Sequence, residues 1–472
     1  MRPTRAIRLT VSSLNSPAPP VPWTAARTLF TRAAAPTVGR SSTALPACRS
    51  ELRASARLPP SSSSAYTSPA DNAALRLRTS SFHTSARLTS SSSSATAPPR
   101  FSYRIAASYS AKGRRFNADR NVYAFNPFVR LKRTATELQR GKRDKKNRPE
   151  SGQDAFFVAH VGDAGTSGGS GAGGSELNDG ALAFGVADGV GGWTDQGIDP
   201  ADFSHSLCDY MASGATGYPD AFPARKSGST APLMPKDLMQ YGYDKVMRDN
   251  AVKGGGSTAC VVTAQADGHF ELANLGDSGL MHFSPNAVRF ATSPQTHAFN
   301  TPYQLTKMPP RILAQMALFG PNQRRGGGGG YHAETPADAA TSSHAVRHGD
   351  VLVLATDGVW DNLSPADALR LVSRYMGGLG GWVAADGDGG SESSRRGSAA
   401  MQEGVGGGGA ATLQEMLAVA IAREAKAASL DHRRDGPFAR EVQRNFPGEN
   451  WHGGKADDIC VVVAVVVGVE GR

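Results

Sequence analysis

Three apolar runs in this chain, far apart in the sequence, each have an aspartate at one end. Two of them, residues 181–187 and 350–354, lead toward Asp188 and Asp357, and each of these aspartates is followed by a glycine. Short runs of this composition predict buried strands. The glycine lets the backbone turn at once and lets a ligand approach closely. The third run follows Asp457. A fold that brings these strand ends together gathers several carboxylates in one place.

Converging aspartates suit hard divalent ions such as Mg²⁺ and Mn²⁺, because these ions prefer oxygen ligands. The pattern therefore favours a metal-dependent hydrolase. For any one of these aspartates the alternative is a turn residue or a helix cap. Asp-Gly after a strand also suggests an aspartyl-phosphate hydrolase of the haloacid dehalogenase type. The Asp-x-Asp motif of that class, however, occurs only at residues 386–388, inside a glycine-rich stretch.

The first hundred residues differ sharply in composition from the rest of the chain. They contain thirteen arginines, no lysine and two acidic residues, among serine runs and scattered prolines. Such a segment cannot bury enough apolar surface to offset the entropy lost on ordering. An Arg- and Ser-rich, acid-poor start is typical of an organellar transit peptide. We therefore expect residues 1–99 to be a disordered leader, cleaved near residues 81–87, and residues 100–470 to form one domain.

The net charge of +10 is unevenly distributed. Residues 1–150 carry a net charge of +21, whereas residues 151–472 carry −11. A nucleic-acid or membrane-surface protein needs a basic face on its folded part, so the acidic domain argues against both. No apolar run is long enough to cross a membrane, and we expect no transmembrane span. The four cysteines include no CxxC pair, which argues against a zinc site.

Hydrophobic periodicity indicates an α+β fold rather than strict β-α-β alternation. Apolar or alternating runs predict strands at residues 101–105, 154–160, 181–187, 350–354 and 459–467, and a meander of short strands over residues 257–292. Apolar stripes with helical spacing predict helices over residues 199–211, 235–247 and 412–429, and a further helix begins near residue 364. Glycine-rich stretches at residues 162–174, 326–330 and 377–409 are expected to be loops.

Six short motifs, taken together and in order, resemble the metal-dependent serine/threonine protein phosphatases of the PPM/PP2C family. They are GQDAFF (152–157), VADG (186–189), GSTA (256–259), LGDSG (275–279), ATDGVWD (355–361) and DDI (457–459). Two longer segments, ADGVGGW (187–193) and QTHAFNTPYQL (295–305), are similar to the compact mitochondrial branch of the family. The resemblance implies a sandwich of two antiparallel β-sheets flanked by α-helices.

The resemblance also implies the catalytic residues. Asp188 matches the aspartate that bridges two Mg²⁺ or Mn²⁺ ions, the carbonyl of Gly189 is a further ligand, and Asp357 and Asp457 match the other metal-binding aspartates. Two such ions can activate a water and offset charge on the phosphoryl oxygens. Asp277 matches a residue associated with a third, weaker metal, or is simply a turn residue.

The sequence departs from the family pattern at three places. Gln153 stands where the family usually has a carboxylate, so the second metal binds more weakly or uses Asp154 instead. Pro149 occupies the position of the phosphate-contacting arginine, and Arg148, one residue away, is the candidate substitute. No histidine can be assigned as a general acid. Asp458 stands where the family often has asparagine and is expected to orient its neighbour.

These departures leave an alternative open, namely a weak or inactive pseudophosphatase that binds phosphoproteins. The family resemblance implies hydrolysis of phosphoserine and phosphothreonine in mitochondrial proteins, with those of coenzyme Q biosynthesis as candidates by analogy. It also implies location in mitochondria, most simply in the matrix, and we expect a monomer that binds no nucleic acid.

Overall fold

The structure is a computed structural model that describes residues 100–125, 148–162, 181–222, 231–318, 334–382 and 411–469. The chain divides into two units, residues 1–94 and 95–472, and all described residues belong to the second. The expected leader and the glycine-rich loops, except for their ends, therefore lie outside the described residues. Among the described helices, none is long and apolar enough to cross a membrane.

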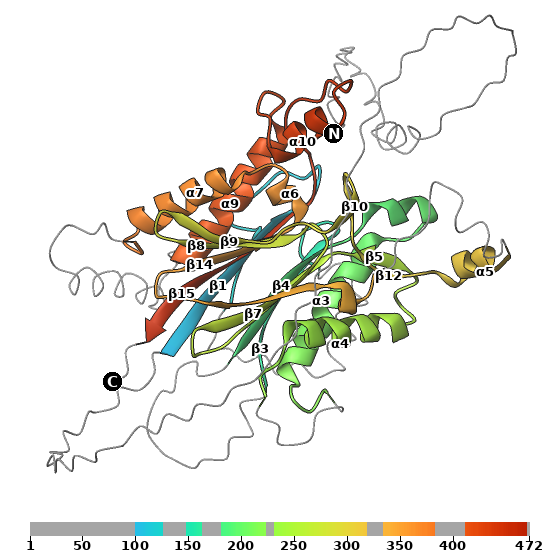
Figure 1. Cartoon of the computed structure of the whole chain (residues 1–472), viewed down its shortest axis with the longest axis horizontal. Coiled ribbons are helices and arrows are strands. Elements are labelled where there is room, and N and C mark those ends of the chain that lie inside the picture. The colour runs from blue at the N-terminus through green and yellow to red at the C-terminus, as the bar shows by residue number, and fades with distance from the viewer. Residues whose placement is uncertain are drawn as a thin grey trace, which may run out of the picture. The chain divides into compact units, whose positions relative to one another are not determined.

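The domain is built on two antiparallel sheets (Figure 1). One has six strands in the order β2-β1-β15-β14-β8-β9, with bounds β1 Arg100–Ser110, β2 Val122–Ala124, β8 Gly279–Ser284, β9 Ala287–Ala291, β14 Val351–Ala355 and β15 Ile459–Val469. The other has five strands in the order β13-β7-β6-β4-β3, with bounds β3 Asp154–His160, β4 Leu182–Asp188, β6 Ala259–Ala264, β7 His269–Leu275 and β13 Ala340–Ala345.

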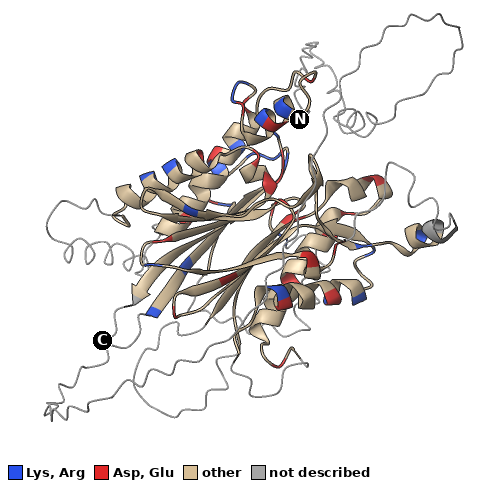
Figure 2. Cartoon of the chain, in the orientation of Figure 1, with Lys and Arg blue, Asp and Glu red and all other residues tan. Residues whose placement is uncertain are grey.

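Three apolar layers hold the sheets and helices together. Side chains on a strand alternate between its two faces, and β15 shows this directly. Val462 and Val466 belong to the core between the sheets, together with Phe184 of β4. Val461 and Val463 face the other way, into the core under the helices. Because β15 is buried on both faces, it is a continuous apolar run rather than an alternating one. Both sheets are mostly uncharged in Figure 2.

Helices cover the outer face of each sheet (Figure 1). The five-stranded sheet packs against α3 (Pro200–Thr216) and α4 (Pro235–Arg248), and the six-stranded sheet packs against α7 (Pro365–Gly378) and α9 (Leu413–Leu430). Asp199 caps α3, and capping boxes at Ser364 and Thr412 start α7 and α9. These caps satisfy N–H groups that have no partner inside the helix. The α+β sandwich predicted from the sequence is confirmed.

Shorter elements fill the remaining described segments. They are η2 (Gly191–Gln196), β5 (Gly255–Ser257), β10 (Thr296–Ala298), β11 (Thr301–Pro302), β12 (Leu305–Lys307), α5 (Pro310–Leu318), η4 (Pro336–Asp338), α6 (Asp357–Trp360) and α10 (Pro437–Asn445). Strands β10 and β11 form a hairpin, and β5 pairs with β12.

The predicted meander over residues 257–292 is wrong in its topology. Strands β6 and β7 pair in the five-stranded sheet, but β8 and β9 belong to the six-stranded sheet. The chain crosses between the sheets at Gly276, Asp277 and Ser278. Gly276 has φ +100°, a backbone conformation that glycine adopts at little cost. The crossing places Asp277 between the two sheets, where a meander would have left it in an ordinary hairpin turn.

Candidate metal centre

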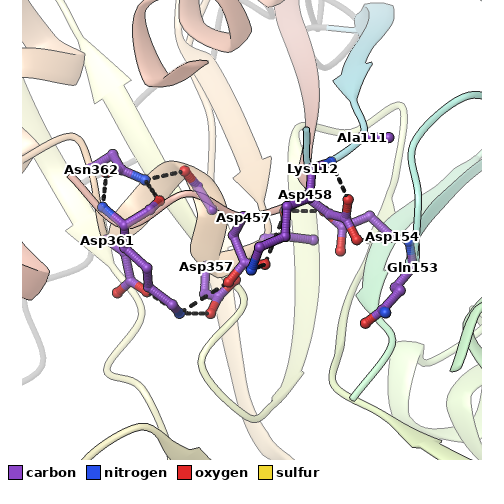
Figure 3. Close-up of polar contacts among 12 residues, drawn as sticks. Ala111, Lys112, Gln153, Asp154, Asp357, Asp361, Asn362, Asp457 and Asp458 are labelled. Atoms are coloured by element: carbon purple, nitrogen blue, oxygen red, sulfur yellow. Dashed lines mark hydrogen bonds and ion pairs between the residues drawn. The ribbon is translucent and has the colours of Figure 1, made fainter. Parts of the chain in front are cut away.

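The predicted aspartates come from both sheets. Asp188 ends β4, and Asp154, at the start of β3, is its antiparallel cross-strand partner. Cβ atoms of such partners lie about 5 Å apart. Asp357 begins α6 directly after β14, and Asp457 lies two residues before β15, which pairs with β14. Figure 3 shows Asp154, Asp357 and Asp457 near one another, and the structure therefore brings distant strand ends together as the sequence predicts.

A hydrogen bond joins the two sheets at this point. The Thr356 hydroxyl donates to Asp154 Oδ2 over 2.8 Å, and the Thr356 backbone N–H donates to the carbonyl of Cys460 over 3.1 Å. Both Thr356 and Asp154 are buried. The side chain that precedes Asp357 thus fixes the carboxylate of Asp154, so the two halves of the acidic cluster have a defined separation.

The pKa values of the carboxyl groups reflect their burial and their closeness to one another. Burial raises the pKa of Asp154 well above its usual value, and the neighbouring Asp458 raises it further. Burial and the nearby Asp357 and Asp154 likewise raise the pKa of Asp188. Like charges in a poorly solvated site disfavour ionisation of one another. A bound cation would remove this penalty.

Among the described residues, two fully buried carboxylate oxygens of the cluster have no hydrogen-bond partner. They are Oδ1 of Asp154 and Oδ1 of Asp277, and both atoms are buried. Buried polar atoms in proteins almost always have a partner, so these oxygens are suited to an ion. An all-oxygen donor set suits Mg²⁺ or Mn²⁺ rather than softer metals. The chemistry of these donor atoms therefore fits the divalent ions that the sequence predicts.

The carboxylates are not arranged around a common point for an ion. Across the described segments, no group of three or more His, Cys, Asp or Glu side chains is placed so that it could hold a metal. A lysine lies among three of the carboxylates. Lys455 Nζ lies 2.5 Å from Asp357 Oδ2 and 2.6 Å from Asp361 Oδ2, and it lies 3.4 Å from Asp457 Oδ2. These side chains turn toward the ammonium group.

Sequence reasoning missed Asp361 and Lys455. Both left a signal, because Asp361 lies one helical turn after Asp357 and Lys455 lies two residues before Asp457. Burial raises the pKa of Asp361 to about 7, although Lys455 lowers it in part. Burial would also raise the pKa of Asp457, but Lys455 and Lys112 hold that pKa below its usual value. The cluster thus contains carboxylates of very different proton affinity.

The Asp458 carboxylate holds the loop before β3 through hydrogen bonds to two backbone N–H groups. Its Oδ1 accepts the backbone N–H of Lys112 over 2.5 Å, and its Oδ2 accepts the backbone N–H of Gln153 over 2.9 Å. A Cβ on Gly152 would lie 2.2 Å from Asp458 Oδ1. Only glycine permits this approach, at φ +73°. Asp458 therefore joins the end of β1 to the segment that carries Gln153 and Asp154 (Figure 3).

Gly189 lies in a tight backbone crossing. Its N–H donates to the carbonyl of Gln153 over 3.1 Å, and a Cβ at this position would lie 2.7 Å from that carbonyl oxygen and 2.9 Å from the carbonyl oxygen of Pro200. Ser204 also donates to the Gln153 carbonyl, over 2.5 Å. The backbone of Gln153 is therefore firmly held between β4 and α3.

Arg148 is bound to the first turn of α3. Its guanidinium donates to Asp202 over 2.7 Å and lies 3.9 Å from Asp199. Its expected contact with a substrate phosphate remains a prediction, because the arginine would have to share its charge with these two carboxylates.

Among the histidines, His297 bonds to Glu334 over 2.9 Å and stacks on Tyr303.

Comparison with known proteins places this architecture in a family. No protein-family model matches the chain. The chain is 32% identical over 282 residues to the mitochondrial protein phosphatase 2C homolog 7 of Saccharomyces cerevisiae, which is 60% of this chain and 69% of that protein. The chain belongs to the protein phosphatase 2C family. It is a serine/threonine protein phosphatase of the PP2C type.

The chain is also similar to other phosphatases. The human protein phosphatase PTC7 homolog is 28% identical over 287 residues, or 60% of this chain and 74% of that protein. Among solved structures, the photosystem II phosphatase PBCP aligns with 77% of this chain and 98% of its own, at 20% identity and a TM-score of 0.44.

Proposed function

We propose that this PP2C enzyme hydrolyses phosphoserine and phosphothreonine in mitochondrial phosphoproteins with the help of two divalent ions, Mg²⁺ or Mn²⁺. Asp154 and Asp188, with the carbonyl of Gly189, would hold ions on the side of the five-stranded sheet. Asp357 and Asp457 would hold them on the side of the six-stranded sheet. Bound ions of this kind offset charge on the phosphoryl group and lower the pKa of water.

One observation carries the proposal, namely the unpaired buried Oδ1 of Asp154 beside the raised pKa of Asp188. A carboxylate cluster that costs free energy without a cation is expected where a cation is used. In this proposal Asp154 takes the place of the family carboxylate that Gln153 lacks. The backbone of Gln153 is bound on three sides, and the carboxylate that enters the cluster is that of its neighbour.

The chain's own residues prepare the site for a phosphate. Thr356 and Asp458 fix the positions of Asp154 and its loop, so that little reorganisation is needed when a substrate binds. Pre-organised charge of this kind is a major source of rate enhancement. The mitochondrial location is supported by the name of the yeast relative and by the arginine-rich, acid-poor first hundred residues.

A phosphopeptide assay tests the proposal. Wild type should release phosphate with Mn²⁺ or Mg²⁺ and lose this activity in EDTA. Asp188→Asn should lower the rate at least about a hundredfold, as expected for loss of a ligand shared by the metal site. Asp195→Asn is the matched control, because Asp195 is exposed on η2, and it should keep the wild-type rate.

The same assay distinguishes the proposed enzyme from a pseudophosphatase. Lys455 among the carboxylates is the observation that favours such a protein, because a lysine competes with metal ions for these ligands. Phosphopeptide binding without turnover at millimolar Mn²⁺ would establish the inactive alternative. Full activity in EDTA would exclude the metal mechanism altogether.

A further inference from the structure

Lys455 is fixed in the acidic cluster by its backbone as well as by its charge. Its N–H donates to Asn362 Oδ1 over 2.9 Å, and Asn362 Nδ2 donates back to the Lys455 carbonyl over 2.9 Å. The same Nδ2 donates to the Gly358 carbonyl in α6, also over 2.9 Å. Asn362 is 1% exposed. The segment before Asp457 is thus tied to the helix that begins at Asp357, and this fixes the point from which the lysine side chain extends.

The surroundings of the ammonium group are those of a cation site. Three carboxylates contact it, at 2.5, 2.6 and 3.4 Å, and the ring of Phe438 lies 5.1 Å from it on a fourth side. A cation over an aromatic face gains further attraction. The lysine side chain is 12% exposed. Water therefore contributes little to its solvation, and the protein supplies the missing stabilisation.

Asp277 belongs to the same group of charges. It lies on the segment that crosses between the sheets, and its buried Oδ1 has no hydrogen-bond partner. Burial and the charge of Asp357 raise its pKa, and Lys455 lowers it. Asp357 and Asp361 contact Lys455 and form one side of the cluster, and Asp277 is near enough for the charge of Lys455 to lower its pKa. Asp154 and Asp188 form the other side, and within the described segments neither of them contacts the lysine.

We infer that Lys455 is a built-in cation that takes the place of a divalent ion on the Asp277–Asp361 side of the cluster. A divalent ion and a fixed ammonium group repel each other strongly when they share ligands in a poorly solvated site. Divalent ions therefore bind only on the Asp154–Asp188 side of the cluster, where Asp357 and Asp457 also contribute ligands. This assignment rests on the proposed function, and it gives Asp277 an electrostatic role in place of the metal-ligand role implied by the family resemblance.

The decisive measurement is the number of Mn²⁺ ions bound per chain. Electron paramagnetic resonance of free Mn²⁺ and calorimetric titration both report it without any substrate. Lys455→Met should bind one Mn²⁺ more than wild type, because the carboxylates of Asp277 and Asp361 then lose the positive charge beside them. Lys455→Arg keeps the charge and should bind the wild-type number.

Lys112→Met is the matched control. Lys112 Nζ also pairs with Asp457, over 3.3 Å, but this side chain is 48% exposed. Removal of an exposed cation changes little, because water and salt screen it. This variant should therefore bind the wild-type number of ions. Equal stoichiometry in wild type and Lys455→Met would overturn the inference.

Thermal unfolding gives a second readout. Metal-free Lys455→Met should melt at least about 5 °C below wild type, because one partner of a buried ion pair is removed. Mn²⁺ should restore most of this loss by binding to the folded state. A loss that Mn²⁺ does not restore would contradict the inference.

Asp277→Asn keeps the inference testable if Lys455→Met fails to fold. This substitution is nearly isosteric and removes a buried charge. It should leave the number of bound Mn²⁺ ions unchanged, whereas loss of one ion would show that Asp277 is a metal ligand and would overturn the inference. The proposed function fails separately. Wild type that binds no Mn²⁺ would disprove the metal mechanism, even where Lys455→Met gains an ion as inferred.

Discussion

His205 should make the folded protein less stable as the pH falls. It lies on α3, is 8% exposed, and its Nε2 is 3.4 Å from the carbonyl oxygen of Gly152. Burial, with the nearby Arg148, lowers the pKa of His205 from 6.5 to about 4. The residue is therefore neutral in the folded state at pH 5, whereas the unfolded chain takes up a proton there. Folding stability linked to His205 is complete above pH 6.5 and falls as the pH decreases toward 4.

The size of this effect follows from the two pKa values. One pKa unit corresponds to about 1.4 kcal/mol. With values of 6.5 and about 4, His205 costs roughly 2 kcal/mol of unfolding free energy between pH 7 and pH 5. The raised pKa values of Asp154 and Asp188 act in the opposite direction, because these carboxyls bind protons more tightly when folded. The total pH profile therefore mixes both signs, and only a comparison of variants isolates His205.

Urea unfolding of wild type and His205→Asn at pH 7 and pH 5 makes that comparison. The wild type should lose roughly 2 kcal/mol more than the variant on acidification. His269→Asn is the control, because the His269 side chain is 60% exposed, and its profile should parallel that of wild type. Parallel profiles for wild type and His205→Asn would refute the reasoning, since they would show that His205 is protonated equally in both states.

Three further predictions concern the loop before β3, the packing at α6 and the leader. Gln153→Glu should leave the Mn²⁺ concentration for half-maximal activity unchanged. Asp154→Asn should raise that concentration severalfold, since only Asp154 enters the cluster. A metal titration with the reverse result would show that position 153, and not Asp154, provides the ligand. Gly358→Ala should destabilise the fold by at least about 2 kcal/mol in urea unfolding, because the new Cβ would lie 1.9 Å from the Asp458 carbonyl oxygen. Gly377→Ala is the control, since a Cβ there would have nothing within 4 Å, and it should be neutral or slightly stabilising. Protein purified from mitochondria should begin near residues 81–87, and N-terminal sequencing that returned Met1 would contradict the proposed import.

The parts of the site that could be predicted are those that depend on strand ends. Asp188 and Asp357 follow apolar runs that are buried in the structure, and Asp457 precedes a third. Period and composition reveal such runs because burial on both faces demands continuous apolar residues. The helix starts at Ser364 and Thr412 were also readable, since capping boxes are local in sequence.

The parts that could not be predicted depend on which sheet a strand joins. Strands β7 and β8 are separated by Gly276, Asp277 and Ser278, a length that equally fits a hairpin. Sheet membership is set by the cores, where Leu272 and Leu280 both face the layer between the sheets. The spacing of residues along the chain does not indicate which strands will pack into that layer. The role of Lys455 was hidden for the same reason, because its partners Asp357 and Asp361 are nearly a hundred positions away.

The segment at residues 295–305 carried the family likeness without suggesting a role, and the structure shows what it contacts. Gln295 anchors the β10–β11 hairpin to Gly276, next to Asp277, through a backbone bond of 2.9 Å. At the hairpin, Phe299 packs against Phe438 of α10, with ring centroids 5.2 Å apart.

Phe438 in turn joins the hairpin to the acidic cluster. Its backbone N–H donates to the Asp361 carbonyl over 3.0 Å, and its ring lies 5.1 Å from Lys455 Nζ. The hairpin therefore supports the aromatic ring that covers the cation, and a segment with no carboxylate of its own helps to determine the charge of the site. Because an aromatic face excludes water from the ammonium group, it strengthens the attraction between Lys455 and its three carboxylates.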